Sequence, residues 1–524
     1  MSEADSPIPV PRGRAREDER VRIVPKHHLL VRLSHWALVP LLFGLIASGL
    51  AIYWAAPIFE LPRGPMNWIY DHLSLGRGYL AAALRMHWAL AYLFMANGAL
   101  YLLGLAAGGG WRALLPRPSD PGEALAMIRY YLGVIPMAIL RRPWPHPPVR
   151  SKYNALQRAA YFTMPLCGAL VVLSGWAMHK PVQLGWLERM FVNYDGARIV
   201  HFACMLVLGS FIVPHVLLVI SDGWDTLRSM ILGWSKRVKG EAHERPETPI
   251  EVPRRRLAAQ SRRGFLLYAA GAAVTAVGAW WLLPDGTRGR LLPGAARGWL
   301  DSLAARVGFT PTCRDRVLDG ALKFDDDVAE ALYSKDRRVR TFHRSEATPL
   351  RNNYNGKTPG PEYLRTWALQ VSGLASGGVE RLTIDDLLRR FPVHEQVTRL
   401  VCVEGWSAVV WWGGIRFADF LAAYPPAQGS RWAAMRSSVN LDRAGRSDPY
   451  YVSIDLETAG HSQTLLATHQ GGRPLTVEHG APMRLLAPMK LGLKNIKAVT
   501  EIAYTEHEPP DYWNERGYSR YDGL

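Results

Sequence analysis

The sequence is poor in cysteine and in acidic side chains, and each shortage argues against a class of protein. Four cysteines occur among 524 residues, at positions 167, 204, 313 and 402, and none belongs to a CxxC motif. This pattern argues against a disulfide framework and a cysteine-based zinc site. Acidic residues number 45 against 62 Lys and Arg, for a formal net charge of +17. Such an excess often indicates nucleic acid as a partner, but here the basic residues gather beside long apolar runs. We therefore expect a lipid bilayer and no nucleic acid.

Long apolar runs are also missing after residue 285, although the chain is long enough for two or three domains. Before that point, five runs reach the roughly 20 mostly apolar residues that a membrane-crossing helix needs. These runs are residues 36–58, 86–106, 158–178, 197–220 and 265–283. We expect the first four to form an all-α transmembrane bundle over residues 25–225. The fifth, within residues 264–284, is expected to be an anchor helix.

The distribution of Lys and Arg sets the expected orientation. The segments before the first span, between spans two and three, and between spans four and five are rich in both, whereas the other two loops carry few. Positive charge favours the cytoplasmic side, which places the C-terminal half in the periplasm of a Gram-negative cell. Residues 1–24 lack the features of a signal peptide and are expected to be a disordered cytoplasmic tail. Residues 226–263 are expected to be a basic cytoplasmic linker in this multi-pass protein of the inner membrane.

Histidines stand at both ends of the fourth span, where imidazole is costly unless something binds it. His201 and His215 are nearly four helical turns apart and therefore share one face at opposite depths. In the expected orientation, His87 lies at the depth of His201 and His35 at the depth of His215. Two such pairs suit two b-type haems with two axial imidazoles each. The alternative, four separate structural histidines, leaves the matched depths unexplained. His179, at the end of span three, is expected to be interfacial rather than a ligand.

The same spans carry a family resemblance. "HW" near the start of spans one and two, "KYNALQRAAY" before span three and H-x13-H in span four resemble the membrane dihaem cytochromes b. This group includes the formate dehydrogenase gamma subunits and the thiosulfate reductase cytochromes b. The resemblance covers residues 25–225 and implies exchange of electrons with quinone or quinol near the inner haem.

A twin arginine precedes the fifth span. "SRRGFL", at residues 261–266, followed by an apolar stretch, resembles a twin-arginine export signal, although it is internal. A fifth span with basic cytoplasmic flanks explains the same residues without export. Because twin-arginine signals accompany folded proteins loaded with cofactors, the pattern also hints at a cofactor in the part that follows.

The part after residue 285 reads as α+β with much β structure. Strand-like stretches are expected at residues 367–373, 397–406, 450–456, 483–488 and 496–505, with helical pieces at 384–391 and 416–424. Residues 285–340 are expected to be a connector before a domain of residues 341–524. The acidic run at 325–327 is interpreted as a helix cap in preference to a docking surface.

Cys402 lies in the most apolar stretch of this part, "RLVCVEGWSAVVWWGG". It could be a buried small hydrophobe, or a thiolate ligand to a metal whose other sulfur ligands come from a dithiolene. Strand alternation predicts that Glu404 shares its face. The Glu404 carboxylate could then shuttle protons in catalysis or act as a hydrogen-bonding strut.

A second resemblance favours the metal. "LTIDDLLRRFPVHEQVTRLVCVEGWS", "HGAPMRLLAPMKLGLKNIK" and "PPDYW" resemble the sulfite-oxidase-type molybdopterin oxidoreductases, and most closely the catalytic subunits of periplasmic protein-methionine-sulfoxide reductases. The resemblance covers most of residues 340–515 and implies molybdenum on a pterin dithiolene with Cys402 as its protein ligand. It also implies cofactor contacts at Asn352, Ser437, His479, Arg484, Lys494, Asn495, Ile496 and Lys497. Of these, Asn495, Ile496 and Lys497 would wrap the phosphate end. "CVEGWS" lacks the basic residues that follow the cysteine in sulfite oxidases proper.

The two resemblances together predict a multidomain membrane oxidoreductase. Its expected fold is an all-α four-helix haem bundle with a fifth anchor helix, followed by an α+β, β-rich molybdopterin domain. The leading hypothesis is that quinol electrons pass through two b haems to molybdenum, which reduces a sulfoxide or similar oxide, small or protein-bound. Two alternatives stay open. One is oxidation of a small periplasmic substrate with electrons given to quinone, and the other is an electron carrier with a metal-free outer domain.

Overall fold

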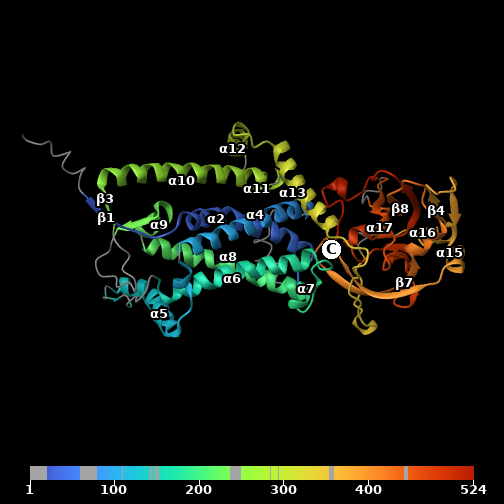
Figure 1. The fold of residues 1–524 in the computed structure, drawn as a ribbon, viewed down its shortest axis with the longest axis horizontal. Coiled ribbons are helices and arrows are strands. Elements are labelled where there is room, and N and C mark those ends of the chain that lie inside the picture. Colours follow the sequence, from blue (N-terminus) through green and yellow to red (C-terminus); the bar gives the residue numbers. More distant parts are fainter. Residues whose placement is uncertain are drawn as a thin grey trace, which may run out of the picture.

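Helices build one end of the molecule and strands build the other, and the two parts lie end to end along the longest axis (Figure 1). The computed structural model describes residues 20–59, 80–108, 110–140, 142, 144–145, 147, 153–222, 224–236, 250–283, 285–292, 294–352, 359–441 and 447–524. We call the helical part the membrane half and residues 341–524 the C-terminal domain.

Five long helices form the membrane half, and all five are long and apolar enough to cross a membrane. They are α2 (Leu29–Ala55), α4 (Leu80–Ala107), α6 (Ala155–His179), α8 (Tyr194–Asp222) and α10 (Arg254–Leu282). Helix α2 packs along α4, and α6 packs along α8. The prediction of five apolar helices is confirmed. Helix α10 begins at Arg254, inside the predicted linker, because arginine is a good helix former and extends the apolar segment.

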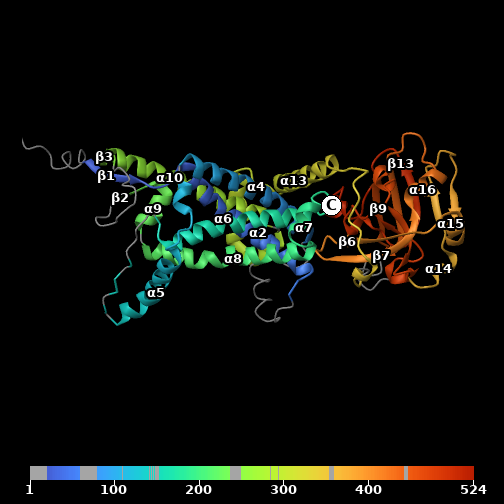
Figure 2. The ribbon, with the colours of Figure 1, turned by 60° about the horizontal axis from the view of Figure 1, so that its bottom comes forward.

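A small sheet closes the end of the membrane half that lies away from the C-terminal domain (Figure 2). Strand β1 (Arg20–Pro25) pairs antiparallel with β2 (Trp234–Lys236) and β3 (Ile250–Pro253). Residues 1–19 of the predicted tail lie outside the described residues. From Arg20 onward the chain is a strand rather than a tail, since its alternating Val and Ile favour β structure.

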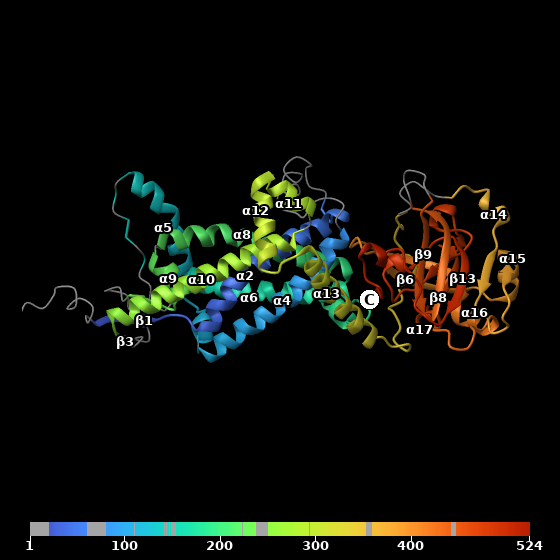
Figure 3. The same ribbon diagram turned by 90° about the horizontal axis from the view of Figure 1, so that it is seen from above.

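Shorter helices lie around the bundle, and one of them, α13 (Pro311–Ala331), extends toward the C-terminal domain (Figure 3). They are α5 (Asp120–Ile139), α7 (Gly185–Met190), α9 (Trp224–Leu232), α11 (Asp285–Leu291), α12 (Gly294–Arg306) and α13 (Pro311–Ala331). Helix α13 starts with the Thr310 hydroxyl capping the Cys313 N–H and with Pro311 at its first position. It then packs beside α4. Asp325 and Asp326, near its end, are buried and hydrogen-bond to residues of other segments. The interpretation of the acidic run as a helix cap is therefore wrong.

Two five-stranded sheets form the C-terminal domain, and its predicted richness in β structure is confirmed. One sheet contains β6 (His394–Val401), β7 (Ser407–Arg416), β10 (Leu465–Gln470), β11 (Arg473–Pro474) and β12 (Arg484–Leu486). The other contains β4 (Leu369–Ser372), β5 (Glu380–Leu382), β8 (Trp432–Asn440), β9 (Pro449–Asp455) and β13 (Val499–Thr505). The domain's α-helices are α14 (Tyr363–Thr366), α15 (Ile384–Arg390), α16 (Phe417–Ala423) and α17 (Leu456–Ala459). Adjacent residues Leu465 and Leu466 belong to apolar clusters on opposite faces of the first sheet, which is therefore covered on both sides.

The last residues of the sequence lie at the junction of the two parts (Figure 1). The Lys180 ammonium donates to the Gly523 carbonyl at 2.9 Å, and the Gln183 N–H donates to the Leu524 carbonyl at 3.3 Å. Leu524 is buried in an apolar cluster with Tyr194 from α8. The C-terminal domain therefore packs directly on the end of the helical bundle.

Candidate functional site

Four histidines of the membrane half form two facing pairs. His87 on α4 and His201 on α8 have ring centroids 6.3 Å apart, and we call them the proximal pair because they lie near the C-terminal domain. His35 on α2 and His215 on α8, the distal pair, have centroids 6.0 Å apart. An imidazole nitrogen lies about 2 Å from a coordinated first-row metal ion, so two rings on one iron have centroids about 6 Å apart. Both pairs therefore fit a single iron with two axial imidazoles.

Serine hydroxyls fix the proton positions of the proximal pair. Ser48 Oγ lies 3.0 Å from His87 Nδ1 and donates its own proton to a carbonyl one turn earlier at 2.7 Å, so it accepts from the ring. Ser174 lies 3.2 Å from His201 Nδ1, and the Val171 carbonyl, which can only accept, lies 3.0 Å from the same nitrogen. Both rings therefore carry their proton on Nδ1, which leaves Nε2 free to bind a metal.

A glycine follows each of these serines and makes room for the ring. A Cβ at Gly49 would lie 3.3 Å from His87 Cε1, and one at Gly175 would lie 3.4 Å from His201 Cε1. These four supporting residues were not predicted from the sequence. The signal was the dipeptide Ser-Gly, which occurs as "ASGLA" in the first span and "LSGWA" in the third.

His179 lies beside the proximal pair without facing another histidine. Its ring packs on Trp88 with centroids 4.8 Å apart, and its Nε2 lies 2.7 Å from Asp325 Oδ1. Asp325 also accepts from the Tyr92 hydroxyl at 2.8 Å and from Lys180 at 3.2 Å. Burial by itself would raise the pKa of Asp325, but its contacts with His179 and Lys180 outweigh burial and hold the pKa well below its usual range. These hydrogen bonds connect α13 to Tyr92 of α4 and to the C-terminal end of α6.

Cys402 opens a tight turn between two strands. Strand β6 ends at Val401, and the Gly405 N–H donates to the Cys402 carbonyl at 2.9 Å. Gly405 has φ +87°, a conformation that favours glycine. The prediction that Cys402 and Glu404 share a strand face is therefore wrong, because this turn interrupts the apolar run. Burial, together with the Glu404 carboxylate, raises the pKa of the Cys402 thiol to about 12. A bound metal cation would overcome that barrier, since metals deprotonate the thiols that coordinate them.

Glu404 nevertheless lies beside the cysteine. Its Oε2 is 4.0 Å from Cys402 Sγ and accepts the Trp406 indole N–H at 2.8 Å. The indole bond fixes the position of the carboxylate, which favours the strut over the proton shuttle among the two roles considered for Glu404.

The structure gathers several predicted cofactor contacts around Lys497. The Lys497 ammonium donates to Asn352 Oδ1 at 3.3 Å and to the Glu478 carbonyl at 3.1 Å. The Ser437 hydroxyl donates to the Lys497 carbonyl at 2.6 Å. Burial, together with the neighbouring Arg484 guanidinium, lowers the pKa of Lys497 to about 7. An anion bound beside Lys497 would stabilise its charged form, so this site favours an anionic ligand.

Arg484 and His479 complete this group. The buried Arg484 donates to the His479 carbonyl at 3.1 Å and to the Asn495 carbonyl at 3.0 Å, and its guanidinium lies over Trp412. His479 Nδ1 is buried, and no atom of the described residues hydrogen-bonds to it. A buried ring nitrogen of this kind needs a partner, so the group fits a polar, anionic cofactor such as a pterin with its phosphate.

The other three predicted contact residues, Lys494, Asn495 and Ile496, bond to other groups of the protein. The buried Lys494 ammonium lies 2.7 Å from Asp511 Oδ2 and donates to the Ser453 carbonyl at 3.1 Å. The N–H groups of Asn495 and Ile496 bond to carbonyls of their own turn, and the Ile496 side chain is fully buried. All three residues therefore have hydrogen-bond partners within the fold, and the predicted contact of Asn495 and Ile496 with the phosphate end stays a prediction.

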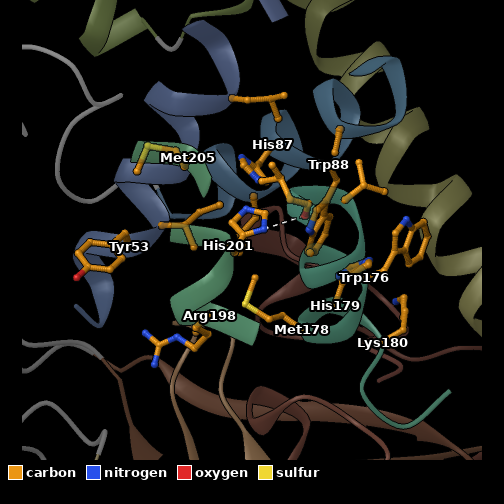
Figure 4. A pocket seen from close by; sticks show the side chains of 18 of the residues that line it. Tyr53, His87, Trp88, Trp176, Met178, His179, Lys180, Arg198, His201 and Met205 are labelled. Atoms are coloured by element: carbon orange, nitrogen blue, oxygen red, sulfur yellow. Dashed lines mark hydrogen bonds between the residues drawn. The ribbon is translucent and has the colours of Figure 1, made fainter. Parts of the chain in front are cut away.

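One cavity of about 300 Å³ joins the two candidate sites (Figure 4). His87 and His201 line it from the membrane half, and Cys402 and Glu404 line it from the C-terminal domain. Figure 4 shows the two rings of the proximal pair close together, with His179 nearby. The sequence could not reveal this continuity, since the two walls come from separate parts of the chain.

Each part of the chain matches the model of a known family. Residues 26–233 match the model of the prokaryotic cytochrome b561 family, and residues 355–513 match that of the oxidoreductase molybdopterin-binding domain. The chain is 37% identical over 200 residues to the putative protein-methionine-sulfoxide reductase subunit YedZ1 of Azospira oryzae, which covers 38% of this chain and 70% of that protein.

A second relative and a solved structure are similar over smaller shares. The chain is 33% identical over 164 residues to the protein-methionine-sulfoxide reductase catalytic subunit MsrP of Xanthomonas campestris pv. campestris. That alignment covers 30% of this chain and 51% of that protein, so the chain spans about half the length of this relative. The sulfane dehydrogenase SoxCD from Paracoccus pantotrophus is similar with a TM-score of 0.24 and 20% identity, over 32% of this chain and 42% of that chain.

Proposed function

This chain belongs to the prokaryotic cytochrome b561 family and carries an oxidoreductase molybdopterin-binding domain, and from that premise we propose that it is a quinol-dependent reductase of sulfoxides or similar oxides. It is a membrane oxidoreductase that depends on molybdopterin and b-type haem. When bound, haem would carry single electrons and molybdenum would exchange an oxygen atom with the substrate. The names of the two relatives support a sulfoxide as substrate.

We assign one haem to each histidine pair. The 6.3 Å and 6.0 Å separations of the ring centroids support this assignment. In the proximal pair, the hydroxyls of Ser48 and Ser174 hold both Nδ1 atoms and turn Nε2 toward the iron. Such outer hydrogen bonds fix a ligand's orientation and raise its basicity.

We assign the molybdenum to Cys402 and the pterin to the group around Lys497. Asn352, Ser437, His479 and Arg484 belong to this group. Lys494, Asn495 and Ile496 are buried and directly precede Lys497 in the chain. Glu404 holds the Cys402 turn in place through Trp406. Buried Arg484 and half-buried Lys497 provide positive charge for an anionic cofactor.

The proposed topology places the C-terminal domain on the periplasmic side of the inner membrane and residues 1–24 in the cytoplasm. The proximal haem then faces the periplasm and the distal haem faces the cytoplasm. The Lys and Arg distribution supports this orientation. Quinol would be oxidised near one of the haems, and the twin arginine at 262–263 would lie at the cytoplasmic end of α10.

The shared cavity is the observation that carries the proposal. His87 and His201 line the same cavity as Cys402 and Glu404. Electrons from the membrane half would therefore reach the oxygen-transfer site without a separate carrier protein.

Stopped-flow spectroscopy on the purified full chain tests this function. We expect two haems and one molybdenum per chain, and haem reduced by a quinol analogue should be reoxidised on mixing with methionine sulfoxide. The Cys402→Ala variant is the matched control, in which haem should stay reduced. If a substrate reduces the haem and no oxide reoxidises it, the enzyme oxidises its substrate and the proposed direction is wrong. Absence of molybdenum from the purified protein would leave an electron carrier only.

A further inference from the structure

The Asp522 carboxyl is buried at the junction of the two halves, and none of the described residues hydrogen-bonds to it. Asp522 is 2% exposed and lines the cavity that contains His87, His201 and Cys402. Neither of its carboxylate oxygens has a hydrogen-bond donor among the residues that the structure describes. A buried polar group without a protein partner calls for an explanation, such as a catalytic role or water in an adjoining cavity.

The surroundings favour the neutral form of this acid. Burial raises the pKa of Asp522 well above its usual range, and the Lys494 ammonium opposes this rise only in part. The carboxylates of Asp511 and Asp326 add to the rise, while Lys490 opposes it weakly. Lys494 is itself neutralised by Asp511 at 2.7 Å. A neutral carboxyl is a proton donor, whereas an ionised one is only an acceptor.

Other ionisable groups line the same cavity from both halves. They are His87, Tyr92, His179, Lys180, Tyr194, Arg198, His201, Asp325, Cys402 and Glu404. Lys180 and Asp325 form an ion pair at 3.2 Å, and Glu404 accepts from the Trp406 indole. Asp522 differs from these carboxylates because no described group engages its oxygens.

The backbone holds Asp522 at this place firmly. Its N–H donates to Ser519 Oγ at 2.7 Å, and its carbonyl accepts from the Leu491 N–H at 2.9 Å. The residue has φ +50°, a conformation that glycine and asparagine adopt readily. Either residue would satisfy this backbone without burying an acid, so the backbone geometry alone does not account for the carboxyl.

We propose that Asp522 is a proton-relay residue for the reaction proposed above, on which this inference rests. Reduction of a sulfoxide, R2S=O + 2e⁻ + 2H⁺ → R2S + H2O, breaks one S–O bond and forms two O–H bonds. The quinol supplies the two electrons. The Asp522 carboxyl gives one of the protons through water in the cavity and is reprotonated from bulk water. Arrival of negative charge near a buried acid, where the dielectric is low, drives this proton transfer.

Infrared spectroscopy tests the resting state of this acid without turnover. Difference spectra between the oxidised and the reduced protein should contain the carbonyl stretch of a protonated carboxyl, which shifts in D2O. The band should be absent from Asp522→Asn, which keeps the shape and tolerates the φ of +50°. It should persist in Asp327→Asn, the matched control, because Asp327 is an exposed acid paired with Lys323 at 2.7 Å.

Stopped-flow mixing tests the relay itself. In Asp522→Asn, reoxidation of haem by methionine sulfoxide should slow by about 10- to 100-fold, the usual size of an acid–base contribution, and the solvent isotope effect on this step should change. Reduction of haem by the quinol analogue should keep its rate, which separates the relay from a general loss of structure. Asp522→Gly, favoured by the same backbone conformation, provides a second variant if the first does not fold.

Two results would overturn the relay. One is a carboxyl band that survives in Asp522→Asn, and the other is reoxidation within twofold of the wild-type rate. If haem of the wild-type protein is never reoxidised by a sulfoxide, the proposed function fails and the relay fails with it. The infrared band would still report the protonation of Asp522 in that case, so the two failures are distinguishable.

Discussion

The membrane half and the C-terminal domain place their functional side chains in different ways. In a straight helix each residue adds a fixed rise, so the fourteen residues between His201 and His215 translate directly into a difference in depth. In the C-terminal domain, Cys402 lies in a turn and Lys497 lies between a short 3-10 helix and strand β13, and their neighbours come from distant segments. Sequence spacing is therefore a reliable guide in the first part and a weak one in the second.

Loss of the Cys402 thiol should have the largest effect and should separate the two parts most cleanly. We expect Cys402→Ala to lower sulfoxide reduction by more than about 100-fold, since ligand-shell changes alone cost 10- to 100-fold. The haem absorption spectrum should stay unchanged because the histidine pairs lie outside this turn. An assay of activity and haem content on the same preparation checks this, and a variant with normal activity would remove Cys402 from the metal site.

Substitution of one histidine tests whether the two pairs are independent. His201→Ala should lower the haem content from two to one per chain and stop electron transfer to the C-terminal domain. His35→Ala should also leave one haem, but with a different absorption band and potential. Pyridine haemochrome analysis and redox titration measure both. Full haem content in His201→Ala would break the assignment.

Lys494 and Lys497 lie close in sequence, and the structure gives them different tasks. Lys494→Met should lower the free energy of unfolding by about 3 kcal/mol, because Asp511 would remain as a buried charge without its partner. Lys497→Met should leave stability near the wild-type value and weaken retention of the pterin. Thermal unfolding and molybdenum analysis of both variants check this. Equal losses of cofactor would restore the role that the sequence motif predicted for Lys494.

The glycines behind the proximal pair allow a milder test of the membrane half. Gly49→Val should displace the His87 ring, since even a Cβ would lie 3.3 Å from Cε1. We expect partial loss of the proximal haem or a shift of its potential. Gly98→Val, on α4 with no atom within 4 Å of the added Cβ, is the matched control. Identical spectra for both variants would show that Gly49 has no part in seating the ring.

Glu404→Gln should have the smallest effect. A glutamine carbonyl can still accept the Trp406 indole N–H, so a strut would survive and activity should fall only a few-fold. A proton shuttle would lose about 100-fold or more. Steady-state rates with methionine sulfoxide decide between the two, and a large loss would assign the protons to Glu404.

The sequence predicted the elements of this fold better than their ends. Five apolar helices and a β-rich domain follow from runs of apolar residues and from alternation. The start of α10 at Arg254 and strand β1 at Arg20–Pro25 were missed, because charged residues extend helices and strands that apolar counts alone end too early. The turn at Cys402 was missed because Val403 and Trp406 continue the apolar pattern through it.

The predicted site was recovered unevenly for a related reason. The pairing of His87 with His201 and of His35 with His215 follows from depth, and the structure contains both pairs. The partner of His179 was not predictable, since Asp325 lies 146 positions later in the chain. The cofactor contacts of Lys494, Asn495 and Ile496 were predicted from a motif. A motif cannot distinguish a donor that faces a ligand from one that already bonds within the fold.

The bonds from Lys180 to Gly523 and from Gln183 to Leu524 have a kinetic consequence. A soluble redox partner must diffuse to its acceptor, and that encounter slows with salt and viscosity. Here the proposed donor and acceptor regions are joined in one body, so internal electron transfer would be a first-order event. Dilution, glycerol and added salt should therefore leave its rate constant unaltered.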